Sequence, residues 1–265
     1  MKIYAIFWRD AHTFGDWTDI KDMKEWAKKV YNESHPSYAE TLLEQAAFYT
    51  TSGDYEKSIK LLLQVKKIFE NSFRDINRAF VNELAISFSR LGIDVVNVIE
   101  GAATKPFAFM AHFPGCGVGG HCIPVDPYYL IEYAKKNGFD HDFLRLARRI
   151  NNHMPKFKAE LTLEALNEKS LAMKGTKVAL LGISYKADID DCRESPSFEI
   201  LKHLKEYGAD VVMFDPFVPK ESSVKSLDEA LLGAKAIVIA TGHKLFRELT
   251  PDKLIKAGVV AVVDG

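Results

Sequence analysis

Residues 176–215 read TKVALLGISYKADIDDCRESPSFEILKHLKEYGADVVMFD. An apolar run stands at each end of this stretch, and a helical run opened by Ser195 and Pro196, an N-cap and first-turn pair, lies between them. Two further apolar runs, AKAIVIAT (234–241) and VVAVVDG (259–265), each follow a helical stretch of their own. Buried parallel strands have this continuous apolar character, so the alternation predicts a doubly wound α/β unit around a parallel sheet.

The chain before this unit has helical periodicity. Apolar residues over 55–91 keep a spacing near 3.6 without a proline, and Gly92 follows as a stop, which predicts one helix of about nine turns. Further helices are predicted over 127–138 and 143–170, with Pro155 either kinking the second or starting a new segment. A helix as long as 55–91 needs a large packing partner, often another copy of the chain.

The first part of the chain gives weaker signals. Residues 2–7 have the pattern of a short strand, and residues 38–70 that of a helical hairpin. The hairpin spaces its small and bulky residues as a tetratricopeptide unit does, but no second copy follows at that period. A single helix-turn-helix is therefore favoured over a true repeat.

Composition limits the class of protein. The 265 residues can hold one large domain or two ordinary ones, and 47% hydrophobic with 27% charged residues is typical of a soluble globular protein. A net charge of -1 gives no reason to expect nucleic-acid or acidic-membrane binding, and no apolar run approaches the ~18 residues of a membrane span. Three cysteines without framework spacing indicate a reducing compartment, so we expect a cytoplasmic protein.

Residues 115–127, GCGVGGHCIPVDP, carry the strongest chemical signal. Cys122 ends a run of four glycines, and Asp126 follows four residues later. Glycines allow a left-handed backbone or a close approach, so they present a thiol more openly than a helix does, and the thiolate is the reactive form of cysteine. Spacing alone also fits a tight loop around a buried structural cysteine. Cys116 and His121 lie nearby without a zinc-site spacing, so we predict no metal.

Several blocks then occur in a fixed order: NSFRD (71–75), ATKPF (103–107), the Gly/Cys stretch, GISYKADIDDCRESP (182–196) and FDP (214–216). In this order the chain resembles the UDP-glucose/GDP-mannose dehydrogenase family from about residue 58 to residue 265. ATKPF followed by GVGGHCIPVDPYYL is typical of the branch that oxidises UDP-N-acetylhexosamines.

The resemblance implies an α/β protein with three parts. A central helical dimerisation domain with the cysteine loop (58–172) precedes a truncated UDP-sugar-binding, Rossmann-like parallel-sheet domain (173–265). The mainly helical segment 1–57 matches neither and stays unassigned. The partners implied are UDP-N-acetylmannosamine or UDP-N-acetylglucosamine and a second copy of the chain, held through the helix over 58–91.

The family oxidises C6 of the sugar in two steps with two NAD+, through a cysteine thiohemiacetal and a thioester that water hydrolyses. The resemblance makes Cys122 the nucleophile and Asp126 the aspartate that positions or deprotonates the water, although Asp126 also suits an N-cap. Lys67 and Asn71, on one helix face at i and i+4, match the donors to the developing oxyanion. A solvated lysine on a charged helix is the alternative for Lys67.

The same resemblance implies the ligand-binding residues. Lys186 and Arg193 match positions near the nucleotide sugar and cofactor, where cationic groups suit a diphosphate. Their alternative is a surface loop balanced by its own aspartates at 188, 190 and 191. Gly119 and Gly120 join the substrate- or cofactor-binding set. Phe109 and Phe113 either line the sugar or uridine pocket or serve as packing.

One expected element is missing. No G-x-G-x-x-G occurs in the chain, and the turn after residues 176–181 carries only Gly182, so no phosphate-cradling turn is evident. In the family an NAD-binding domain precedes the central helix, and the chain usually continues past the Asp-Gly found here at 264–265. We therefore expect a truncated dehydrogenase, NAD-dependent by family and inactive alone. A non-catalytic dimerisation or nucleotide-sugar-binding remnant is the alternative, and the gluco or manno preference stays open.

Overall fold

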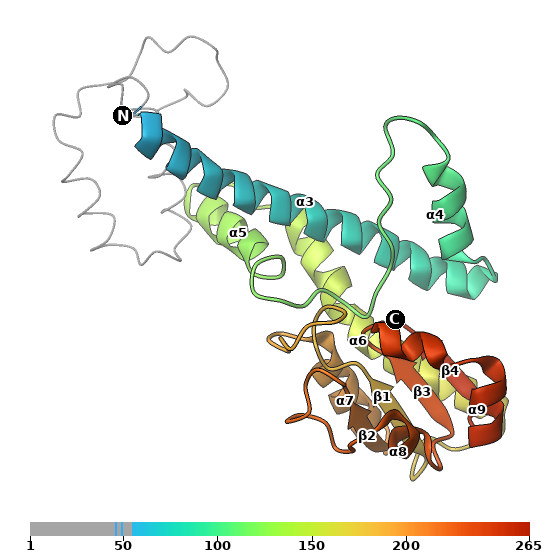
Figure 1. Cartoon of the computed structure of the whole chain (residues 1–265). Coiled ribbons are helices and arrows are strands. Elements are labelled where there is room, and N and C mark those ends of the chain that lie inside the picture. Colours follow the sequence, from blue (N-terminus) through green and yellow to red (C-terminus); the bar gives the residue numbers. More distant parts are fainter. Residues whose placement is uncertain (1–45, 47–48, 50–54) are drawn as a thin grey trace. The chain divides into compact units, whose positions relative to one another are not determined.

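The structure is a computed structural model that describes Ala46, Tyr49 and residues 55–265, without the side chains of 55–65. It divides into two units, Met1–Lys67 and Ile68–Gly265. The strand predicted at 2–7 and the turn of the hairpin predicted over 38–70 lie outside the described residues. The second unit holds the elements that position the candidate site (Figure 1).

The predicted long helix is confirmed as α3 (Tyr55–Leu91), with 37 residues. Its last turn carries Arg90, which suits the negative end of the helix dipole, and Gly92 follows with φ +67°, a left-handed stop that glycine adopts without strain. Helix α4 (Val95–Ala103) begins after Asp94, whose carboxylate accepts hydrogen bonds from the first free backbone N–H groups.

Helices α5 (Asp126–Lys136) and α6 (Asp142–Glu168) follow the cysteine loop, as predicted. Helix α6 continues through Pro155, so no new segment starts there. Its first half contacts α5, and its second half packs on α7, β3 and β4, with Ala159 and Leu166 fully buried. One helix thus belongs to both the helical domain and the sheet domain.

The four predicted strands are confirmed as a parallel sheet in the order β2-β1-β3-β4. The strands are β1 (Lys177–Leu181), β2 (Asp210–Phe214), β3 (Ala236–Ile239) and β4 (Ala261–Asp264). The helices of this domain are α7 (Pro196–Glu206), α8 (Leu227–Leu231), the 3-10 turn η2 (Lys244–Glu248) and α9 (Pro251–Ala257). In the parallel register the carboxyl ends of β1, β2 and β3 meet at one edge, because Leu181 pairs with both Phe214 and Ile239.

The sheet is covered on both faces, as in a doubly wound fold. Val178 and Leu180 of β1 pack in one apolar cluster with residues of α6 and α7, while Ala179 and Leu181 pack in a second with residues of α8 and η2. Successive residues of a strand point to opposite faces, so a strand buried on both sides reads as an unbroken apolar run. Within the described residues no helix has a stretch long and apolar enough to cross a bilayer.

Candidate active site

The cysteine loop, residues 115–125, is anchored at its first residue by a chain of buried amides. The Gly115 N–H donates to Asn82 Oδ1 at 2.9 Å, and the Asn82 amide donates to Asn151 Oδ1 at 2.9 Å. Asn151 in turn donates to Asp75 Oδ1 at 2.9 Å, and Arg148 forms a buried ion pair with the same aspartate. Because buried polar groups are costly when unpaired, these hydrogen bonds fix the position of the start of the loop against α3 and α6.

Gly119 and Gly120 lie where a second segment packs onto the loop. This segment, residues 184–195, is called the Lys186 loop below. A Cβ on Gly119 would stand 2.7 Å from Glu194 O and 2.8 Å from the Pro196 ring and Tyr185 Cβ. Gly120 has φ +89°, and its N–H donates to Arg193 O at 3.3 Å. The glycines therefore let two loops from different domains meet at backbone distance.

Cys122, Asp126 and Asn71 come together where the cysteine loop enters α5. The Cys122 side chain is exposed, and its carbonyl accepts from the backbone N–H groups of Val125 at 3.1 Å and Asp126 at 2.9 Å. The Asn71 amide donates to Asp126 Oδ2 at 2.7 Å, across 55 residues of sequence. The N-cap of α5 is Val125, without a side-chain bond, so the Asp126 carboxylate faces Asn71 rather than capping the helix.

The environment of Asp126 makes it a stronger base than a free aspartate. Partial burial raises the pKa of Asp126, while the bond from Asn71 and the nearby His121 lower it, and the net effect is upward. A carboxylate with a raised pKa accepts a proton more readily.

Lys67 is the last residue of the first unit, and its side chain is exposed. It precedes Asn71 by four residues on α3. Its place at the site remains a prediction.

A pocket of about 450 Å³ lies in the second unit between α3, the cysteine loop and the Lys186 loop. Its walls carry three cationic side chains, the aromatic rings of Phe113 and Tyr185, and backbone of the cysteine loop. Its lining comprises Arg74, Arg78, Ala111, His112, Phe113, Gly117, Val118, Gly119, Ile123, Tyr185 and Lys186. Of the predicted ligand-binding residues, the pocket brings together Phe113, Gly119 and Lys186, while Phe109, Gly120 and Arg193 are outside its lining. Cys122 is outside the lining, and its neighbour Ile123 is part of it.

Sequence reasoning missed Arg74, Arg78 and Tyr185. Arg78 donates to Phe113 O at 3.0 Å. The pKa of Arg78 is lowered, mainly by its partial burial and further by the positive charge of the neighbouring Arg74. Two guanidinium groups so close together favour an anion between them. Helical spacing was the available signal, because Arg74 and Arg78 follow Asn71 by three and seven residues and so share its face.

Arg193 is held by its own loop. Its guanidinium pairs with Asp191, with Nη2 at 2.6 Å from Oδ2, and this partner lowers the pKa of Asp191 to about 2. Asp191 is also the main cause of a raised pKa at Arg193, and Cys122 adds a smaller contribution. The thiol of Cys122 therefore lies within electrostatic range of the guanidinium.

The three thiols have different surroundings. Cys122 is exposed and Cys192 half-buried, while Cys116 is buried and its pKa is raised to about 11 by desolvation. A thiol with such a pKa stays protonated and unreactive near neutral pH. The residues that the structure describes contain no group of three or more metal-ligating side chains, and a metal-free site stays a prediction.

Two family models match the chain. The central domain of the UDP-glucose/GDP-mannose dehydrogenase family matches residues 64–153, and the UDP-binding domain of the same family matches residues 179–265.

The relatives point in the same direction. The chain is 39% identical over 194 residues to UDP-N-acetyl-D-mannosamine dehydrogenase of Pyrococcus horikoshii, covering 73% of this chain and 45% of that one. It is 33% identical over 237 residues to UDP-N-acetyl-D-glucosamine 6-dehydrogenase of Pseudomonas aeruginosa, covering 87% and 56%. The chain thus spans about half the length of the curated relatives it matches.

Among solved structures, the fold is similar to the NDP-N-acetyl-D-galactosaminuronic acid dehydrogenase of Methanosarcina mazei. That match has a TM-score of 0.71 and 32% identity, and covers 77% of this chain and 46% of the other. The two domain matches, the doubly wound sheet and the glycine-bordered cysteine loop agree. The chain belongs to the UDP-glucose/GDP-mannose dehydrogenase family, of which it contains the central and UDP-binding domains.

Proposed function

We propose that this chain supplies the cysteine and the nucleotide-sugar site for oxidation of C6 of a UDP-N-acetylhexosamine to the uronic acid. The observation that carries the proposal is the Asn71–Asp126 hydrogen bond beside the exposed Cys122, next to a cationic pocket. The names of the relatives, which act on UDP-N-acetyl-D-mannosamine or UDP-N-acetyl-D-glucosamine, support the substrate class.

The residues of this chain account for the covalent and hydrolytic steps. The Cys122 thiolate adds to the C6 aldehyde carbon, forming the C–S bond while the carbonyl oxygen takes a proton. When C6 has reached the oxidation level of a thioester, water attacks it, Asp126 takes the proton of the water, and the Cys122 thiolate leaves. Asn71 orients the Asp126 carboxylate for this role. Lys67, by resemblance, donates to the oxyanion.

The oxidations themselves are the chemistry that NAD supplies when bound, and the turn after β1 does not fit that cofactor's pyrophosphate. Gly182 is the one glycine in the turn after β1. A Cβ there would meet Thr241 O at 2.6 Å, so protein fills the space that a phosphate would need. We therefore assign no pyrophosphate site to the turn after β1, and we expect the chain alone to bind substrate without reducing NAD.

The pocket suits the diphosphate of the nucleotide sugar. Arg74, Arg78 and Lys186 supply cations from two domains, and a diphosphate carries the anionic oxygens that guanidinium groups bind in pairs. Phe113 and Tyr185 offer ring surface to the sugar or base.

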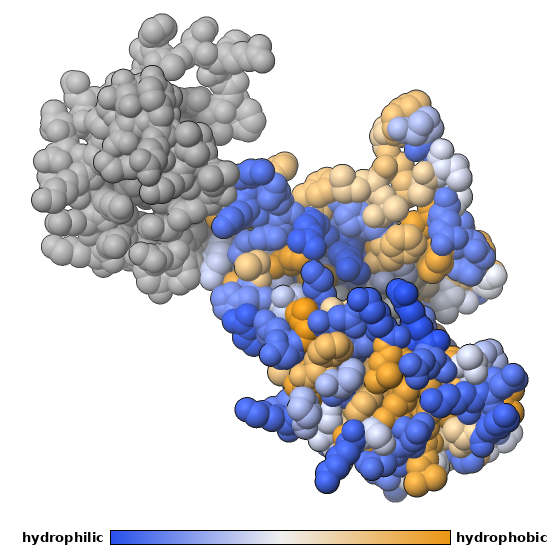
Figure 2. All heavy atoms as spheres, in the orientation of Figure 1, coloured by the Kyte–Doolittle hydropathy of each residue, from blue (hydrophilic) through white to orange (hydrophobic). Residues whose placement is uncertain are grey.

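A homodimer through α3 is part of the proposal. Phe69, Phe73 and Phe80 lie on one side of this helix and are 70%, 43% and 58% exposed. Hydrophobic residues also gather over α4 and the loop after it (Figure 2). Burying such a stripe against a second copy removes apolar surface from water. Sedimentation should give a dimer that Phe80→Asp dissociates, and a monomeric parent chain would contradict this part.

Binding and thiol protection test the main proposal. UDP-N-acetylglucosamine and UDP-N-acetylmannosamine should bind in titration calorimetry and slow the alkylation of Cys122 by iodoacetamide. Arg78→Ala and Lys186→Ala should weaken binding about tenfold. Lys202→Ala, a matched control at an exposed α7 position, should not.

The results of these binding and alkylation experiments distinguish a catalytic chain from a binding-only module. Binding without protection of Cys122 would favour a non-catalytic nucleotide-sugar-binding module, and no binding of either sugar would sink both. Steady NADH formation by the chain alone, abolished by Cys122→Ala, would contradict the expected lack of NAD reduction.

A further inference from the structure

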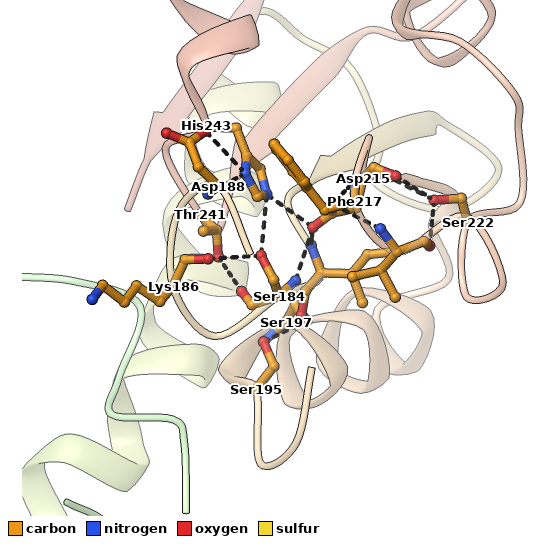
Figure 3. A network of polar contacts seen from close by, with 12 residues as sticks. Ser184, Lys186, Asp188, Ser195, Ser197, Asp215, Phe217, Ser222, Thr241 and His243 are labelled. Atoms are coloured by element: carbon orange, nitrogen blue, oxygen red, sulfur yellow. Dashed lines mark hydrogen bonds and ion pairs between the residues drawn. The ribbon is translucent and has the colours of Figure 1, made fainter. Parts of the chain in front are cut away.

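Three polar side chains are buried together at the carboxyl edge of the sheet (Figure 3). Ser184 follows β1, Asp215 follows β2 and His243 follows β3, and each is at most 1% exposed. None of the three lines the pocket, and the catalytic proposal does not use them. Buried groups of this kind need partners, so the direction of each hydrogen bond is informative.

The hydrogen bonds fix the tautomer of His243. The backbone N–H of Asp188 donates to His243 Nδ1 at 2.9 Å, so in the neutral ring the proton is on Nε2. Nε2 stands 2.9 Å from Asp215 Oδ2 and 3.2 Å from Ser184 Oγ, both of which can accept.

Asp215 is held in place by backbone N–H groups. Its Oδ2 accepts from the N–H groups of Ile183 at 2.6 Å and Ser184 at 2.9 Å, and its Oδ1 accepts from Phe217 at 2.8 Å. Burial alone would raise the pKa of Asp215, but these backbone donors outweigh it and lower the pKa. The carboxylate therefore stays charged and ties β1 to the turn after β2.

Both ring nitrogens of His243 contact the Lys186 loop, Nε2 at Ser184 Oγ and Nδ1 at the Asp188 N–H. Ser184 Oγ donates to Lys186 O at 2.9 Å, and Thr241 Oγ1 donates to Ser184 O at 2.6 Å. Asp188 has φ +61°, a strained conformation for a residue with a side chain, and its carboxylate accepts from the Lys244 N–H at 3.1 Å. His243 thus holds Ser184 and Asp188, the residues two before and two after Lys186.

The held segment reaches the pocket directly. Lys186 and Tyr185 both line it, and Tyr185 lies against Gly119 and Gly120 of the cysteine loop. We propose that His243 is a positioning residue for the nucleotide-sugar site: it acts through Ser184 and Asp188 to hold Lys186 at the pocket. The identity of the ligand rests on the proposed function, whereas the holding of the loop does not.

Two substitutions separate the two sides of the ring. In His243→Asn the amide oxygen can replace Nδ1 and accept from Asp188, but the side chain is too short for Asp215 and Ser184. The Ser184 hydroxyl still donates to Lys186 O in that variant. In His243→Gln the amide can donate to Asp215 and leaves the Asp188 N–H without its acceptor. His203→Asn, a partly exposed histidine of α7, is the matched control.

The expected pattern is asymmetric. In the full chain, His243→Gln should weaken UDP-N-acetylglucosamine binding about tenfold and speed amide hydrogen exchange over 185–192, whereas His243→Asn should stay within about threefold. In a Lys186→Ala background, His243→Gln should cause no further loss of affinity, because its effect passes through Lys186. Ser184→Ala, a mild change, should weaken binding in the same direction and serves if His243→Gln fails to fold.

Equal behaviour of the Asn and Gln variants, or losses that add fully to that of Lys186→Ala, would overturn the positioning role. If His243→Gln failed to fold and Ser184→Ala bound the sugar nucleotide with wild-type affinity, the positioning role would also be overturned. If the parent chain bound neither UDP-N-acetylglucosamine nor UDP-N-acetylmannosamine, the proposed function and the role of His243 in binding would both be wrong. Hydrogen exchange in the two variants would still decide whether His243 holds the loop.

Discussion

Replacing Gly119 with alanine tests whether the contact between the two loops shapes the site. The added Cβ would stand 2.7 Å from Glu194 O and 2.8 Å from the Pro196 ring, neither of which is the end of a flexible side chain. One loop must therefore move, and overpacking of this kind costs about 1–3 kcal/mol of the free energy of unfolding. The chemical-denaturation midpoint should fall, and UDP-N-acetylglucosamine binding should weaken because Lys186 moves with its loop.

Gly101 provides the matched control. It lies inside α4, and a Cβ there would meet nothing within 4 Å. Gly101→Ala should therefore raise the free energy of unfolding by about 0.5–1 kcal/mol, the ordinary helix preference for alanine. If Gly119→Ala kept the parent midpoint and affinity while Gly101→Ala was stabilised, the argument from close approach would be refuted.

Three further predictions follow from the site. Cys122 should be alkylated first under brief, limiting iodoacetamide, and Cys116, whose pKa is raised to about 11, only after unfolding; peptide mapping that found Cys116 first would contradict this. Because the folded pKa of Asp126 is raised, its charge destabilises the fold once the pH exceeds its unfolded value of 3.8. Asp126→Asn should therefore raise the denaturation midpoint at pH 7 and not at pH 3, and equal shifts at both would count against it. Arg148→Met should cost about 3–5 kcal/mol by leaving the buried Asp75 without its counter-charge, and a loss below about 1 kcal/mol would show that water reaches the pair.

The sheet and the long helices were predictable because their signals are local. Each strand is a short unbroken apolar run, and α3 keeps its period for 37 residues without a breaker. Pro155 stayed ambiguous because a proline lacks the N–H of the helix bond and its ring crowds the carbonyl four residues earlier, so a kink or a break was open. In the structure Pro155 is buried and α6 continues through it.

The site was predictable only where a motif carries it. Cys122, Asp126 and Lys186 stand in recognisable blocks. His243 and Tyr185 act through contacts with segments far away in the sequence, such as Asp215 and Gly120, and no local period records such contacts. Which polar groups pair over a long sequence distance depends on how the strands assemble at the sheet edge. A pattern read along the sequence holds no information on that assembly.

The continuity of α6 has a mechanical consequence. This helix carries Asn151, which anchors the cysteine loop, and fifteen residues later (about 22 Å of helical rise) its Leu166 is buried in the core of the sheet. Because α6 runs unbroken from one domain into the other, the helix itself provides no loop at which the two could pivot. Under the proposed function, a nucleotide sugar would therefore reach the pocket by movement of its bordering loops, and the hydrogen bonds that hold the Lys186 loop would oppose that movement.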